Sequence, residues 1–192
     1  MRKLALMAIN VWLSSFLWTE LAYAAEFFCP AGNVTCLIAA INEANQNFQD
    51  NTINLKAGTY TLTTIDNVGD QFGNQFDGAA NGLPVIVGRI TIRGQGSSLT
   101  RIERAIDPIF ADPQFRIFKI QAGAVLNLES LAVMKGFITH SIGGGIVYNL
   151  GNLTVSESDI SQGIAFQSSG GGGIRNDGTL VVRMSRIFVI TE

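Results

Sequence analysis

A repeat of 27 residues in the second half of the chain constrains the fold more than any other feature. Four columns keep this spacing: Leu126, Leu153 and Leu180; Leu128, Val155 and Val182; Leu131, Ser158 and Ser185; and Val133, Ile160 and Ile187. A fixed long period is typical of stacked supersecondary units, because one unit alone cannot bury its apolar face. The spacing therefore predicts a solenoid.

The residue pattern within each repeat indicates strands. Residues 125–128 and 153–155 alternate with period two, and residues 180–182 are apolar throughout, which favours strands over helical turns. Glycine runs at 143–145 and 170–173 separate these strands, and each run is followed by an asparagine, Asn149 or Asn176. Gly and Asn tolerate positive φ and mark turns. A flexible linker would also be rich in glycine, but the apolar columns keep their register across these runs.

The expected fold is all-β, a right-handed parallel β-helix of about five coils over residues 52–192. Equivalent strands of successive coils would pair in parallel and stack like side chains in columns. A β-sandwich fits less well, since it needs turns roughly every 8 to 12 residues and no long period. Asn149 and Asn176 are expected to form a structural corner ladder of hydrogen-bonded side chains.

The N-terminus predicts export. A basic start, an apolar run at residues 4–18 and the small-x-small ending at residues 22–24 have the form of a signal peptide, residues 1–24. A single domain would then occupy residues 25–192. The alternative, a membrane anchor, needs ~20 apolar residues, and this run is shorter. We expect an extracellular, cell-surface or periplasmic protein whose mature chain has no membrane span. The net charge of −2 gives no basic excess for nucleic acid.

Two features are expected to close the N-terminal end of the coils. Cys29 and Cys36 are the only cysteines, and an even number in an exported chain predicts a disulfide, with free thiols as the alternative. Two cysteines are too few for structural zinc. Helical spacing of Leu37, Ile41, Ala44 and Phe48 predicts an amphipathic cap helix at residues 35–47, with Thr35 as its N-cap. Such a helix would cover open backbone groups and the apolar interior.

The first coils are less regular than the later ones. Residues 52–62 predict two strands about a glycine corner, residues 85–93 and 100–103 predict the second coil, and residues 115–120 lead into the third. Residues 66–82 interrupt this series with Asp66, Asp70 and Asp77 among glycines. These carboxylates are candidate Ca²⁺ ligands, but their spacing matches neither an EF-hand nor a glycine-rich nonapeptide, and a solvated loop explains them more simply.

Several segments resemble a family of bacterial exported proteins. Residues 36–45, 53–62, 81–84, 90–96 and 144–146 with Asn149 are similar to right-handed β-helix proteins with a CSLREA-type N-terminal motif, whose repeats look like those of polymorphic outer-membrane proteins and pectin-lyase-like folds. The resemblance implies the fold and export but no particular activity. The usual Ser-Leu-Arg-Glu core is replaced by residues 37–40, Leu-Ile-Ala-Ala. The family also continues with further coils beyond the position of Glu192, so the chain is expected to be a truncated gene product, a fragment, or one half of an end-to-end dimer.

No acid pair of the kind that cleaves glycosidic bonds is visible in the repeats. Such a site needs two carboxylates roughly 5 to 9.5 Å apart, yet Asp159 aligns with Ala132 and Arg186, and Glu129 aligns with no second acid. The single histidine, His140, is explained as a solvated loop residue.

The leading hypothesis is an exported, non-enzymatic β-helix for surface display, adhesion or carbohydrate contact, without a cofactor. Carbohydrate, a host or cell surface, and end-to-end self-association are the expected partners. The first alternative is a polysaccharide lyase or glycoside hydrolase of pectin-lyase-like fold, with a site drawn from Asp70, Asp77 and Arg101. The second alternative is a truncated remnant without independent function.

Overall fold

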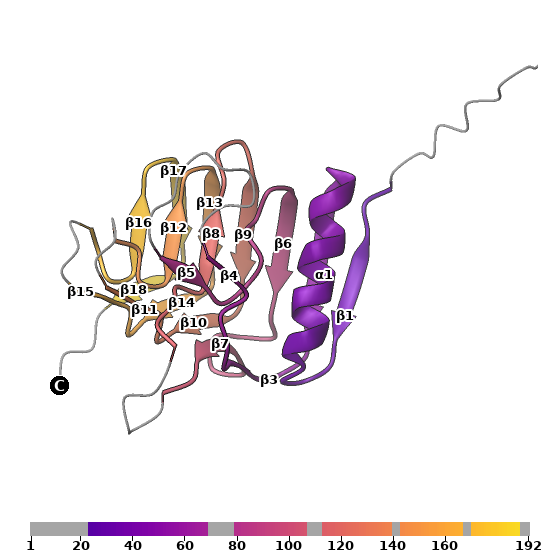
Figure 1. The fold of residues 1–192 in the computed structure, drawn as a ribbon. Coiled ribbons are helices and arrows are strands. Elements are labelled where there is room, and N and C mark those ends of the chain that lie inside the picture. The colour runs from indigo at the N-terminus through magenta and orange to yellow at the C-terminus, as the bar shows by residue number, and fades with distance from the viewer. Residues whose placement is uncertain (1–22, 69–78, 107–112, 140–142, 167–169, 189–192) are drawn as a thin grey trace, which may run out of the picture.

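A computed structural model of the chain describes residues 23–68, 79–106, 113–139, 143–166 and 170–188. This part is mostly β, with one helix, and most of its strands lie side by side along the molecule in parallel sheets (Figure 1). The predicted signal peptide, residues 1–24, falls almost entirely outside the described residues. Among the described residues, no helix is both long and apolar enough to cross a bilayer.

Three parallel sheets contain most of the strands. The six-stranded sheet has the order β1 (Glu26–Cys29), β2 (Asp50–Leu55), β6 (Arg89–Arg93), β9 (Val125–Glu129), β13 (Asn152–Ser156) and β17 (Thr179–Arg183). The five-stranded sheet has the order β3 (Gly58–Leu62), β7 (Thr100–Arg104), β10 (Ala132–Met134), β14 (Asp159–Ser161) and β18 (Arg186–Phe188). The three-stranded sheet has the order β8 (Phe118–Ile120), β12 (Val147–Asn149) and β16 (Ile174–Asn176).

Two short strand pairs complete the described part of the chain. Strands β11 (Phe137–Thr139) and β15 (Ile164–Phe166) pair in parallel, whereas β4 (Asn67–Val68) and β5 (Ala80–Asn81) form an antiparallel pair. The antiparallel pair lies between β3 and β6, in the segment that interrupts the sequence repeats.

The 27-residue columns are aligned by strand pairing. Leu153 on β13 pairs with Leu126 on one side and with Leu180 on the other, and Ile160 on β14 pairs with Val133 and Ile187. Equivalent positions are 39 residues apart between β2 and β6 and 36 between β6 and β9, as Asp50 with Arg89 and Arg93 with Glu129 illustrate. The predicted stacking of the columns is therefore confirmed. The step in this sheet is 27 from β9 onward, whereas β1 and β2 pair at a step of 26, as Glu26 with Thr52 shows (52−26).

The core lies between the sheets and is built from the inward positions of each strand. Leu126, Leu128, Val155 and Ile160 are fully buried, because alternate residues of a strand face opposite sides of a sheet. Burial decreases in the last described repeat, where Val182 is 42% exposed.

Non-glycine residues form the bend between the six-stranded and five-stranded sheets. Ser130, Glu157 and Met184 have φ values of 54°, 50° and 47° at the same place in three successive repeats. The sequence predicted Gly and Asn at the corners, so this bend was missed. The next strand begins two residues after each of these positions, and the same left-handed conformation turns the chain from one sheet into the other each time.

The cap helix α1 covers the N-terminal end of the sheets (Figure 1). It runs over Val34–Asn47 and buries its apolar side, Leu37, Ala40, Ile41 and Ala44, in the same core as Ile53 and Ile90. Two details of the prediction are wrong. Asn33, not Thr35, is the N-cap, because its side chain accepts a hydrogen bond from the Cys36 amide at 2.9 Å. Phe48 does not join the apolar side, because the chain leaves the helix there at φ 55° and the ring is 72% exposed.

A disulfide joins Cys29 to Cys36 and so connects β1 to the first turn of α1. Cys29 is the last residue of β1, a strand that the sequence did not predict, and it is buried. Strand β1 pairs with β2 over four residues and extends the six-stranded sheet past the first predicted coil.

Candidate functional site

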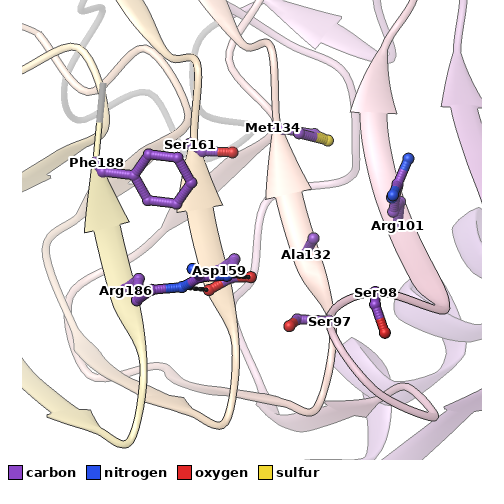
Figure 2. Close-up of a pocket in the computed structure, with 9 residues that line it drawn as sticks. All are labelled: Ser97, Ser98, Arg101, Ala132, Met134, Asp159, Ser161, Arg186 and Phe188. Atoms are coloured by element: carbon purple, nitrogen blue, oxygen red, sulfur yellow. Dashed lines mark hydrogen bonds and ion pairs between the residues drawn. The ribbon is translucent and has the colours of Figure 1, made fainter. Parts of the chain in front are cut away.

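The outer face of the five-stranded sheet carries a hollow of about 290 Å³. Strand β7 contributes Arg101, β10 contributes Ala132 and Met134, β14 contributes Asp159 and Ser161, β18 contributes Arg186 and Phe188, and the loop before β7 contributes Ser97 and Ser98 (Figure 2). This face mixes charged, hydroxyl and apolar groups over four neighbouring strands. Such a mixture is typical of surfaces that bind a polar ligand with some apolar character.

Strand register explains why the hollow forms at this place. Arg101, Ala132, Asp159 and Arg186 pair across β7, β10, β14 and β18 and form one row of outward side chains. Ala132 carries the smallest side chain of the row and stands between two large charged ones (Figure 2). Because its methyl group fills little of the space above the sheet, the row has a gap at β10.

Asp159 and Arg186 form an ion pair at one side of the hollow. The Arg186 Nε donates to the Asp159 Oδ1 at 2.9 Å, and Nη2 donates to Oδ2 at 2.8 Å. The hydrogen bond from Arg186 holds the pKa of Asp159 below its ordinary value, and the side chain of Ser97 contributes to the same lowering. The pKa of Arg186 is raised for the reciprocal reason. Asp159 is therefore a carboxylate at neutral pH.

Arg101 stands on the other side of the gap and has a different environment. It is exposed, and its row neighbours, Thr59 on β3 and Ala132 on β10, carry no charge. Glu103, the next outward residue of β7, is paired with Lys135 at 3.0 Å. In the described part of the chain, no ion pair occupies the Arg101 guanidinium.

The acidic group of the hollow is held in an ion pair. Asp159 is the one acidic side chain among the described residues that line it, and Arg186 already holds both of its carboxylate oxygens. Glycoside hydrolysis through two carboxylates needs a second acid about 5 to 9.5 Å away. The lining offers no such pair.

The corner asparagines form hydrogen bonds within the fold. The Asn149 Nδ2 donates to the Asn176 Oδ1 at 2.6 Å and to the Thr179 carbonyl at 2.8 Å, while Asn149 Oδ1 accepts from the Gly151 amide at 3.1 Å. Asn149 is fully buried and pairs with Asn176 across β12 and β16. These contacts join two neighbouring repeats, and the residues lie on a different sheet from the hollow.

Of the remaining candidate residues, Asp66 lies in the described part of the chain and does not line the hollow. Asp66 is exposed and accepts a hydrogen bond from Asn67 at 2.9 Å. Asp70, Asp77 and His140 lie outside the described residues. Within the described ranges, no three His, Cys, Asp or Glu side chains gather in a way that would hold a metal ion.

Sequence reasoning missed most of the hollow. It placed Ala132, Asp159 and Arg186 in one column, but Arg101 lies 31 positions before Ala132 and falls outside the 27-residue register. Ser97 and Ser98 belong to a loop and have no periodic signal. The alternation of outward residues on β10 and β18 was the available signal for Met134 and Phe188.

Comparison with known proteins finds no matching family model, no similar curated protein and no similar solved structure.

Proposed function

We propose that this chain is a right-handed parallel β-helix of an exported protein that contacts carbohydrate through the hollow above Ala132, without catalysing a reaction on it. The single observation that carries the proposal is the row of Arg101, Ala132, Asp159 and Arg186, which places a gap among hydrogen-bonding groups. The predicted signal peptide, residues 1–24, supports a location where glycans are met.

The strand pairing supports the β-helical part of the proposal. Three parallel sheets receive their strands in turn, and Leu126, Leu153 and Leu180 stack in neighbouring repeats of one of them. Connections between parallel strands of one sheet are right-handed in about 98% of cases. A β-helix accounts for both features, and this rule favours the right-handed form.

The side chains of the hollow match the chemistry of a sugar. Serine hydroxyls both donate and accept hydrogen bonds, the Asp159 carboxylate accepts from ligand hydroxyls, and guanidinium groups donate. Met134 and Phe188 add an apolar edge against which the C–H groups of a sugar ring can pack. The volume of about 290 Å³ is close to the lower end, roughly 300 Å³, of the range for small-ligand pockets, so a single small unit of a ligand is the size considered.

Retention of polysaccharides by the purified protein tests this proposal. We expect the protein to bind at least one member of a panel of neutral and acidic polysaccharides in affinity electrophoresis, and Ala132→Leu to weaken that binding about tenfold or more by filling the gap. Thr154→Leu, on the outer face of β13, is the matched control and should bind like the unaltered protein. Thermal unfolding of both variants verifies that they fold.

Two results would contradict the proposal. Binding that is equally strong in the Ala132→Leu variant would place the contact elsewhere on the molecule. Release of unsaturated or reducing ends from a polysaccharide, with or without Ca²⁺, would show a lyase or hydrolase instead.

A further inference from the structure

The hollow has more positive than negative charge, although the whole chain is acidic. Two guanidinium groups, Arg101 and Arg186, and one carboxylate, Asp159, line it, whereas the formal net charge of the chain is −2. Arg186 and Asp159 neutralise each other through two hydrogen bonds. The excess charge of the hollow therefore belongs to Arg101.

The position of Arg101 keeps its guanidinium available to a ligand. Both neighbours in its row are uncharged, and Glu103 on the same strand is paired with Lys135. Arg101 and Asp159 lie two strands apart, which corresponds to about 9.6 Å between their backbones. A ligand above Ala132 can therefore contact Arg101 at one end and Asp159 at the other (Figure 2).

The two ends of the gap select for different chemical groups. A guanidinium presents a planar fork of donors that fits a carboxylate or sulfate through two parallel hydrogen bonds. A carboxylate accepts hydrogen bonds and repels an anion, so the Asp159 end favours neutral hydroxyls. Ser97 and Ser98 supply further hydroxyl groups along the rim.

We propose that the hollow binds an anionic saccharide, with the acidic group on Arg101, the ring above Ala132 and the sugar hydroxyls toward Asp159 and Ser97. This inference rests on the proposed function, because it names the class of carbohydrate that the same site takes. The acidic group could be a planar carboxylate or a tetrahedral sulfate, since both are oxyanions that accept hydrogen bonds from a guanidinium.

Calorimetric titration of the full chain with three ligands tests this inference: oligogalacturonate, its methyl-esterified neutral form, and a sulfated dextran oligosaccharide. We expect an acidic ligand to bind about tenfold or more tightly than the neutral ester, and Arg101→Gln to remove that advantage. Arg101→Lys should restore only part of the affinity, because an ammonium keeps the charge but loses the fork. Stronger binding of oligogalacturonate than of the sulfated dextran would assign the site to carboxylates, and the reverse order would assign it to sulfates.

Arg183→Gln is the matched control. Arg183 is also exposed, but it lies on β17 of the six-stranded sheet, and its loss should leave both affinities unchanged. Equal binding of acidic and neutral ligands, or equal losses in the Arg101→Gln and Arg183→Gln variants, would overturn this inference and leave the carbohydrate site standing. Absence of binding by all three ligands would overturn the inference, and the polysaccharide panel described above decides separately whether the proposed function fails with it.

Discussion

The two partners of the Asp159–Arg186 ion pair differ in exposure, and this difference determines how much the pair contributes to stability. Asp159 is 15% exposed in its side chain, whereas Arg186 is 73% exposed. Water therefore screens the arginine end, and the contribution of the pair to stability should be small, about 0.2 to 1 kcal/mol. The structural role of this pair is to orient the carboxylate, which keeps the left wall of the gap in Figure 2 in place.

Asp159→Asn should lower the free energy of unfolding by less than about 1 kcal/mol at pH 7. The pKa of Asp159 is lowered in the folded protein, so its stabilising effect is present above the unfolded pKa of about 3.9 and is lost as pH falls through the folded pKa. Urea unfolding of both proteins at several pH values measures the difference. A difference of the same size at neutral pH and far below pH 3.9 would contradict this assignment.

Helix α1 shows that local hydrogen bonds decide where an element begins. Thr35 looked suitable as an N-cap in the sequence, yet the side chain of Asn33 binds the Cys36 amide two residues after the helix starts. Cys36 also forms the disulfide with Cys29, which joins the first turn of α1 to β1. The N-terminal end of the helix is therefore held by both a covalent bond and an N-cap hydrogen bond. Helical periodicity located α1 to within a residue but did not distinguish between two polar residues that both suit an N-cap.

Asn33→Ala should lower the free energy of unfolding by about 1 kcal/mol, because the Cys36 amide loses its acceptor. Asn33→Asp should retain most of the stability, since a carboxylate oxygen caps equally well. Denaturant unfolding without reducing agent, which leaves the disulfide intact, compares the variants. Equal losses in both variants would show that the asparagine acts otherwise than as a cap.

At the scale of the whole molecule, burial along a column changes while the residue type stays the same. Leu126 and Leu153 are almost completely buried, whereas Leu180, two repeats after Leu126, is partly exposed. Burial depends on having a neighbouring repeat on both sides, and the position of Leu180 has one on one side in the described part of the chain. Stability contributions should therefore follow position in the stack.

Leu153→Ala should cost about 2 to 5 kcal/mol in the free energy of unfolding, because it leaves a cavity inside the core. Leu180→Ala should cost clearly less, since part of the removed surface was already in contact with water. Both substitutions remove the same atoms, so urea unfolding of the two variants compares the free-energy cost of the same change at two positions. Equal costs would mean that the two leucines are buried alike in solution.

The sequence predicted those features that repeat, and it missed those that depend on contacts between unequal repeats. The leucine columns anticipated which strands would pair. Arg101 pairs with Ala132 at a sequence separation of 31 residues (132−101) instead of 27. The repeat therefore gave no indication that Arg101 lies in the hollow. Strand β1 was missed because it is a single short segment that has no repeat of its own.

Along the six-stranded sheet, paired residues are separated in sequence by 26, then 39, then 36, then 27 positions, so distance along the chain does not determine which strands are neighbours. A strand recognises its neighbour by backbone hydrogen bonds and by the side chains beneath them, and the length of the connecting segment enters only as a slowly growing entropy. A change in the length of a connecting segment therefore costs little where its residues are outside the core, whereas buried residues such as Leu83 and Ile86, between β3 and β6, tie parts of that segment to the strands.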